Sequence, residues 1–278
     1  MCKLTTFAFG FVCTLIMFQI ANASTYACSH PEICRMAQII LNENSSKGIT
    51  LENIIVQSGD PHTFEPSIQD IKKLMQAPLL LVGPIELNPW MKNISSLRSK
   101  EKNLKTTNLL LPNFSSTEYP TEDKESLGHF WLYPKIYCHM KKALAIEFQQ
   151  QTTCNSNDIE TLLSADLKNI SLPIVLTHDA LLPLLKKLAP NKNQIIAVKG
   201  STHHEEVSAA AVKKVYDALK EPKIIWIIEN NIATAENIKN KIRSTDIVVK
   251  IDTAKSPTLD GDFALLQSLH KKFQEIKL

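Results

Sequence analysis

The chain has 278 residues, of which 44% are hydrophobic and 21% are charged, and its formal net charge is +3. This hydrophobic content excludes an intrinsically disordered chain. The small net charge, with lysines scattered along the chain, excludes nucleic acid as the expected partner. The length suits one large domain or two modest lobes, each with its own core.

The first 23 residues predict a secretory signal peptide. Lys3 supplies a positive charge, residues 7–18 form an apolar run, and Ala21-Asn22-Ala23 has the small residues of a cleavage site. The alternative is a membrane anchor, which needs about 20 apolar residues, and this run is shorter. Val12 stands where a lipoprotein carries a small residue before its cysteine, Cys13. We therefore expect cleavage near Ala23 and an exported protein without a lipid anchor.

The cysteines indicate disulfide bonds. Of the six in the sequence, Cys2 and Cys13 leave with the signal peptide, and four remain. An even number in an exported chain favours disulfides, because the compartment is oxidising. The local pairings Cys28–Cys34 and Cys138–Cys154 are the simplest of the three possible connectivities. The alternative is a thiolate metal site, but the spacings lack the short C-x2-C of structural zinc sites.

Short apolar runs rich in β-branched residues predict strands buried on both faces, as in parallel sheets. They cover residues 54–56, 79–82, 174–176, 195–198, 224–228 and 247–251. Amphipathic stretches between them predict helices. One helix begins after Ser67, which is expected to cap it, with Asp70 at its third position. The other expected helices cover residues 135–151, 157–169, 180–188 (with Pro183 in the first turn), 209–219, 234–243 and 262–276.

Alternating strands and helices predict an α/β fold. The pattern occurs in two blocks, so we expect an N-terminal lobe over residues 24–140 and a C-terminal lobe over residues 171–278. Each lobe would hold a parallel sheet flanked by helices. Residues 141–170 would form a helical connector. Ligands in such folds bind at the carboxyl ends of strands and between lobes, so the cleft is the expected binding site.

Three histidines lie at the transitions where such a fold places ligand-binding groups. His62 follows the strand predicted at 54–56, His129 follows a polar, acidic segment, and His178 follows the strand predicted at 174–176. Three imidazoles with one carboxylate would satisfy tetrahedral zinc. For each histidine alone, a surface or hydrogen-bonded core residue is the commoner role. Judged from spacing alone, a metal site and these ordinary roles are equally well supported.

The remaining histidines are expected at the surface. His203 and His204 lie beside two glutamates in a predicted loop, where a secondary metal site is the alternative. His30, His139 and His270 have no partner at ligand spacing.

Several motifs resemble those of the metal-binding solute-binding proteins of zinc and manganese ABC transporters. The match runs over nearly all of the mature chain, and the first motif is long and specific. The motifs are Asp60-Pro61-His62-Thr63-Phe64-Glu65-Pro66, Glu86-Leu87-Asn88-Pro89-Trp90-Met91, His129-Phe130-Trp131-Leu132-Tyr133-Pro134, Leu176-Thr177-His178-Asp179-Ala180, the stretch from Gly200 to Ser208, and Ile251-Asp252-Thr253.

This resemblance implies a metal site formed by His62, His129, His178 and Asp252. Glu229 matches a family glutamate near the cleft and would hold a ligand imidazole. A histidine at position 178 is typical of zinc members, whereas manganese members carry a carboxylate there. The expected function is therefore capture of Zn²⁺ in the periplasm and its delivery to the membrane permease of an ABC importer. A monomer is expected.

Several features of the sequence depart from the family, including a connector shorter than the family's long backbone helix. Tyr133 stands where the family has aspartate, and Thr253 replaces the proline after Asp252. Residues 112–128, a predicted exposed loop, contain no histidine, although many zinc members carry a histidine-rich loop there. Accessory metal capture by this loop is therefore not expected.

Three alternatives stay open beside zinc delivery. The same role could serve Mn²⁺ or another divalent metal. A zinc-dependent hydrolase would also use three histidines, but the sequence has neither H-E-x-x-H nor G-x-S-x-G. An exported adhesion protein has no sequence feature in its favour. The chain also lacks the phosphate-binding motif of an ATPase. We expect a binding protein and not an enzyme.

Overall fold

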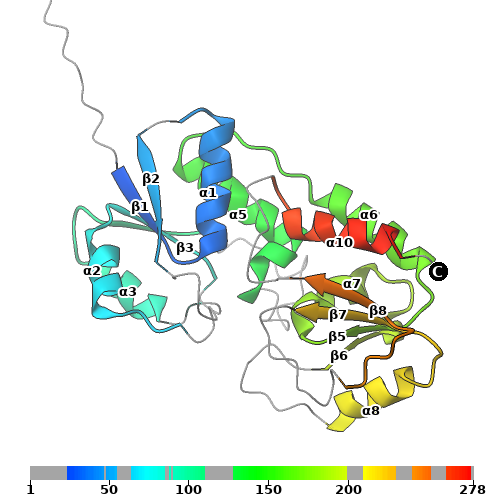
Figure 1. Cartoon of the computed structure of the whole chain (residues 1–278). Coiled ribbons are helices and arrows are strands. Elements are labelled where there is room, and N and C mark those ends of the chain that lie inside the picture. The colour runs from blue at the N-terminus through cyan, green and yellow to red at the C-terminus, as the bar shows by residue number, and fades with distance from the viewer. Residues whose placement is uncertain are drawn as a thin grey trace, which may run out of the picture.

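The structure is a computed structural model, and it describes residues 24–46, 48–54, 64–84, 88, 90–109, 128–198, 209–229, 240–251 and 261–276. Figure 1 shows two separate sheets with α5 (Pro134–Glu147) lying between them. Each sheet has four parallel strands. The predicted α/β fold with two lobes is therefore confirmed. Among the described helices, none combines the length and the apolar character that crossing a bilayer requires.

The first sheet has the strand order β2-β1-β3-β4. Its strands are β1 (Ser24–Cys28), β2 (Ile49–Asn53), β3 (Leu79–Val82) and β4 (Lys105–Asn108). Its connections contain α1 (Pro31–Glu43), α2 (Ile68–Gln76) and α3 (Met91–Arg98). The order reverses between β1 and β3, and in open α/β sheets ligands bind outside the carboxyl ends of the strands at such a point.

The second sheet has the order β6-β5-β7-β8. Counted along the chain, each sheet therefore places its second strand beside its first, followed by its third and fourth. Its strands are β5 (Ile174–Leu176), β6 (Ile195–Ala197), β7 (Ile225–Glu229) and β8 (Ile247–Ile251). Among the described residues, its connections contain α7 (Leu182–Leu188), α8 (Ala209–Ala218) and the short 3-10 helices η2 (Asp179–Leu181) and η3 (Lys192–Gln194). The order reverses between β5 and β7, so the second lobe repeats the switch point of the first.

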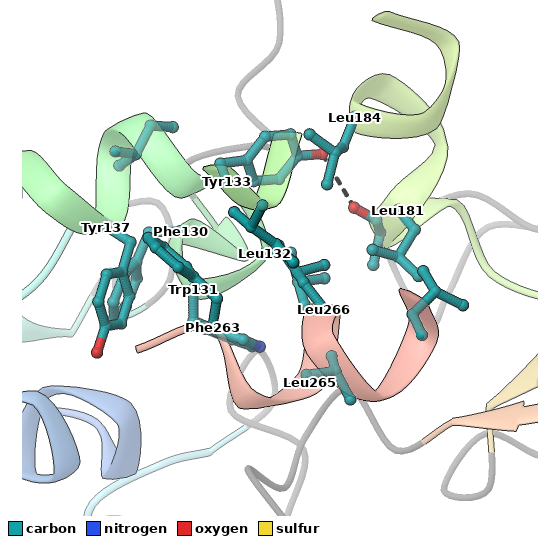
Figure 2. Packing of buried hydrophobic residues seen from close by; sticks show 14 of the residues in the cluster. Phe130, Trp131, Leu132, Tyr133, Tyr137, Leu181, Leu184, Phe263, Leu265 and Leu266 are labelled. Carbon is teal, nitrogen blue, oxygen red and sulfur yellow. Dashed lines mark hydrogen bonds between the residues drawn. The ribbon is translucent and has the colours of Figure 1, made fainter. Parts of the chain in front are cut away.

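One large core cluster includes side chains from both lobes. It is completed by η1 (Phe130–Leu132), α6 (Ser156–Asn169) and α10 (Ala264–Gln274), and α10 packs on α6. Figure 2 shows the aromatic residues of η1 and α5 in this cluster beside Phe263. Burial of this apolar surface favours a fixed arrangement of the lobes.

Ion pairs of one buried lysine also join the lobes. Lys141 on α5 is fully buried, and its Nζ lies 2.9 Å from Glu43 Oε1 on α1 and 2.9 Å from Asp262 Oδ2 before α10. Tyr137 Oη donates a hydrogen bond of 2.9 Å to the other oxygen of Asp262. Burial raises the pKa of Tyr137, which stays a neutral donor.

Both local disulfides of the simplest connectivity are present. Cys28–Cys34 joins the end of β1 to α1, with 5.5 Å between Cα atoms. Cys138–Cys154 joins α5 to the segment before α6, with 5.4 Å between Cα atoms. The thiolate alternative is thereby excluded for these four residues.

The strand predictions are confirmed for β3, β5 and β8, and those for β6 and β7 differ by one residue. The prediction at residues 54–56 is wrong, because the strand there covers Ile49–Asn53 and ends before Ile54; residues 55–56 lie outside the described residues. β1 and β4 were not predicted. Their sequences, STYAC and KTTN, are not continuous apolar runs.

The helix predictions are largely confirmed. Ser67 caps α2 as expected, and with Asp70 it forms a capping box in which each side chain accepts from the other residue's backbone N–H. Pro183 lies in the first turn of α7. Of the helix expected at 234–243, residues 240–243 are not helical and the rest lies outside the described residues. The proposed lobe boundary at residues 140–141 falls within α5, and the lobe limits stay a prediction.

Candidate metal centre

His178 and Glu229 meet at the switch point of the second sheet. His178 follows β5 after Thr177, and Glu229 ends β7. The distance between His178 Nδ1 and Glu229 Oε1 is 3.0 Å, and each side chain is 4% exposed. The backbone also joins the two strand ends, because Glu229 N donates to Thr177 Oγ1 over 3.2 Å.

The Glu229 carboxylate decides which nitrogen of His178 carries the proton. A carboxylate oxygen accepts hydrogen bonds, so the neutral ring donates from Nδ1 and keeps a lone pair on Nε2. This is the arrangement in which a carboxylate orients a metal-binding imidazole. The contact is what the expected role of Glu229 requires, while the role itself stays a prediction.

His129 lies beside His178, although the two come from different lobes of the predicted division. Their ring centroids are 5.3 Å apart, with an angle of 72° between the ring planes. His129 is 5% exposed. Tyr133 Oη donates a buried hydrogen bond of 2.9 Å to the carbonyl of Ala180, and this bond ties the His129 segment to the turn after His178 (Figure 2). Tyr133, which stands where the family has aspartate, thus bridges the two histidine segments.

Two of the four predicted ligands, His62 and Asp252, lie outside the described residues, as do His203 and His204. Asp252 directly follows Ile251, which pairs with Glu229 in the sheet. Within the described ranges, no group of three histidine, cysteine, aspartate or glutamate side chains could hold a metal ion. The described part of the candidate site is therefore the pair His129 and His178, with Glu229 on the latter.

Asp179 was not singled out by the sequence reasoning. It is buried, and its Oδ1 lies 3.8 Å from His178 Nε2. Its place directly after His178 in the Leu176–Ala180 motif was the available signal.

The expectation that His30 lies at the surface is wrong. His30 follows β1, is 1% exposed, and stacks on Trp131 with 4.6 Å between ring centroids. His139 is partly buried, and His270 Nδ1 lies 2.6 Å from Asp166 Oδ2 between α10 and α6. Sequence spacing missed His30 because its neighbours in space come from a segment about 100 residues away.

The fold matches solved structures, including two that are described as binding a metal. The AdcAII protein of Streptococcus pneumoniae has a TM-score of 0.67 and 15% identity, and the match covers 92% of this chain and 99% of that one. The periplasmic zinc-binding protein TroA of Treponema pallidum has a TM-score of 0.62 and 14% identity, covering 90% and 97%. The Fe(III)-bound YtgA of Chlamydia trachomatis has a TM-score of 0.61 and 13% identity, covering 91% and 97%. At these identities the likeness shows the fold alone.

A direct comparison with curated protein sequences gives no match. The family model described as "Zinc-uptake complex component A periplasmic" matches residues 27–276, which is nearly all of the chain beyond the predicted signal peptide. The chain therefore belongs to the ZnuA family of metal-binding proteins, which serve ABC importers as solute-binding components and are not enzymes.

Proposed function

We propose that this protein captures one Zn²⁺ ion in the periplasm and delivers it to the membrane permease of an ABC importer. The ion would be held by His62, His129, His178 and Asp252, with Glu229 orienting the imidazole of His178. The observation that carries this proposal is the contact between the His129 and His178 rings, together with the Glu229 carboxylate on Nδ1 of His178.

The donor chemistry favours zinc over manganese. Neutral imidazole is a good ligand for zinc, whereas Mn²⁺ prefers sites richer in carboxylate and water. The described pair supplies two ring nitrogens, and the nearby carboxylate of Glu229 is engaged with a ring nitrogen. Because the fold neighbours include an Fe(III)-bound protein, iron is the competitor that a metal analysis must include with manganese.

Burial of both imidazoles supports a carrier. A cation held by these side chains is shielded from water, which slows its loss before the protein reaches the permease. Export would follow from the signal peptide predicted over residues 1–23, and the mature chain would act as a monomer.

Zinc titration of the mature chain tests this proposal. Competition with a chromogenic chelator should give one tight site per chain. His62→Ala and His178→Ala should each lower the zinc affinity at least 100-fold, since each removes a ligand, while circular dichroism stays that of a folded protein. His270→Ala is the matched control, because this histidine pairs with Asp166 and not with the site. Wild-type affinity in His178→Ala would contradict the site.

The physiological metal needs a second measurement. Elemental analysis of protein purified from its own compartment should find zinc in excess of manganese and iron. Manganese or iron as the main metal would leave the carrier role in place and change its cargo.

A further inference from the structure

The carboxyl ends of β1 and β5 are built in the same way. Ser29 N donates to Leu81 O on β3 over 2.9 Å, and Thr177 N donates to Ile227 O on β7 over 3.0 Å. Each hydroxyl then accepts from the backbone of the neighbouring strand end: Gly83 N donates to Ser29 Oγ and Glu229 N to Thr177 Oγ1, both over 3.2 Å.

These matching bonds make His30 the counterpart of His178, because each follows the bonded hydroxyl residue directly. They also make Gly83 the counterpart of Glu229. The first lobe therefore has a buried histidine at its switch point, and it has a glycine where the second lobe has a carboxylate.

The bonding of His30 argues against a role as a metal ligand. Its Nδ1 accepts a hydrogen bond of 3.1 Å from Glu32 N and caps the start of α1. A neutral imidazole that accepts at Nδ1 carries its proton on Nε2 and offers no lone pair there. His178 has the opposite arrangement, because its Nδ1 faces a carboxylate.

The ring of His30 instead belongs to a row of aromatic rings, which within the described residues links it to His178. It stacks on Trp131 at 4.6 Å with an interplanar angle of 17°. Trp131 meets His129 edge to face at 5.5 Å, and His129 meets His178 at 5.3 Å. The row therefore runs from the switch point of the first sheet to that of the second.

His30 is held firmly enough to position its neighbours. The cap bond fixes its ring against the first turn of α1, which contains Pro31. The Cys28–Cys34 disulfide joins residues on either side of it, six apart in sequence. A ring restrained in this way offers Trp131 a fixed surface, and Trp131 in turn limits the orientations open to His129.

We propose that His30 is a positioning residue for the metal site, which holds the His129 imidazole in place through Trp131 without binding the ion. This inference rests on the proposed function. Two variants separate the ring from the cap. His30→Asn keeps a side chain that caps helices well but removes the stacking ring. His30→Phe keeps an aromatic face but removes the cap.

Each variant is measured in zinc competition titrations, in stopped-flow dissociation with excess chelator, and in thermal unfolding without metal. His30→Asn should bind zinc about tenfold more weakly and release it faster, as expected when support for a ligand is lost, with little change in Tm. His30→Phe should keep the zinc affinity within about threefold, while its Tm falls by about 2–4 °C from loss of the cap. His30→Ser, which also caps, replaces His30→Asn if that variant does not fold.

Trp131→Leu provides an independent check from the other side of the stack. It should lower the zinc affinity by a similar factor, and the double variant with His30→Asn should lose little more, because both changes break one interaction. Additive losses would overturn the proposal.

Unchanged affinity and release rate in His30→Asn would overturn the proposal, as would equal loss of affinity in His30→Asn and His30→Phe. The same series includes wild type and His178→Ala. Tight wild-type binding that His178→Ala abolishes and His30→Asn leaves intact overturns the role of His30 alone. Absence of zinc binding by the wild type overturns the proposed function and the role of His30 with it.

Discussion

The switch points of the two sheets have the same backbone arrangement, but the histidine at each has a different hydrogen-bond partner. In both, the order reverses beside a strand that is followed by a hydroxyl residue and then a histidine, Ser29-His30 in one and Thr177-His178 in the other. His30 Nδ1 accepts from a backbone N–H, whereas His178 Nδ1 faces the carboxylate of Glu229. The partner of Nδ1 thus decides whether Nε2 is a donor or a possible metal ligand.

The largest effect that tests this difference is the pH dependence of zinc affinity. Metal binding needs neutral imidazole, so affinity is present above the imidazole pKa and is lost as the pH falls through it. The proposed site has three ligand imidazoles, His62, His129 and His178, so the zinc affinity should fall by more than about 1,000-fold between pH ~7.5 and pH ~5. Isothermal titration across this range measures it.

His30→Asn sharpens this measurement. It should weaken binding by the same factor at every pH and leave the slope unchanged, because His30 is not a ligand. A slope reduced by one proton in this variant would make His30 a ligand and remove the contrast between the sheet ends.

The next largest effect concerns the carboxylate that distinguishes the second sheet end. Glu229→Ala removes the acceptor on His178 Nδ1, so either nitrogen of the neutral ring can carry the proton. Zinc affinity should fall about 10–100-fold, the usual range for the partner of a ligating histidine. Chelator competition measures this, and Glu221→Ala, an exposed glutamate before β7, is the control. Wild-type affinity in Glu229→Ala would contradict the orienting role.

A smaller effect tests the bond that ties the His129 segment to the second sheet end. Tyr133→Phe removes the hydroxyl that donates to the buried carbonyl of Ala180. A carbonyl left unsatisfied should lower the free energy of unfolding by about 1–3 kcal/mol. Urea denaturation measures this, with Tyr216→Phe on the exposed face of α8 as the control. Equal stability of the two variants would show that water replaces the bond.

The smallest effect concerns the glycine that stands where the second lobe has Glu229. A Cβ at Gly83 would lie 2.8 Å from Cδ1 of Ile33, which is buried in α1. Gly83→Ala should therefore cost about 1 kcal/mol of stability, since only the end of the Ile33 side chain must shift. Zinc affinity should change less than twofold. A loss of zinc affinity clearly greater than twofold would show that the first sheet end contributes to the site beyond His30.

Local sequence patterns were sufficient for elements that a run of neighbouring residues identifies. The Ser67 cap and the apolar runs of β3, β5 and β8 were predictable, because each can be recognised from residues close together in the chain. β4 was missed because its sequence, KTTN, belongs to a short and partly exposed strand. β1 lies between β2 and β3 and pairs with both. It was missed because its tyrosine and its polar residues interrupt the apolar run that is typical of such a strand.

The residues of the candidate site also divide into those that the sequence could identify and one that it could not. His129 and His178 could be selected from their places in motifs, and so could Glu229 through the family resemblance. The role of His30 could not, because it depends on Trp131, which is adjacent to it only after folding. The pattern that would have helped is the repeated hydroxyl-histidine pair after a strand, but two residues are too few to distinguish a repeat from chance.

The sequence by itself determined the α/β class, the two blocks of strands, the predicted export signal and the candidate ligands, because periodicity, capping and motif residues act over short distances. Only the tertiary structure decided which disulfides form, how the two switch points correspond, and which histidine faces a carboxylate. Those properties depend on contacts between segments far apart in the chain, and the protonation pattern of an imidazole follows from the partner that folding brings to each of its nitrogens.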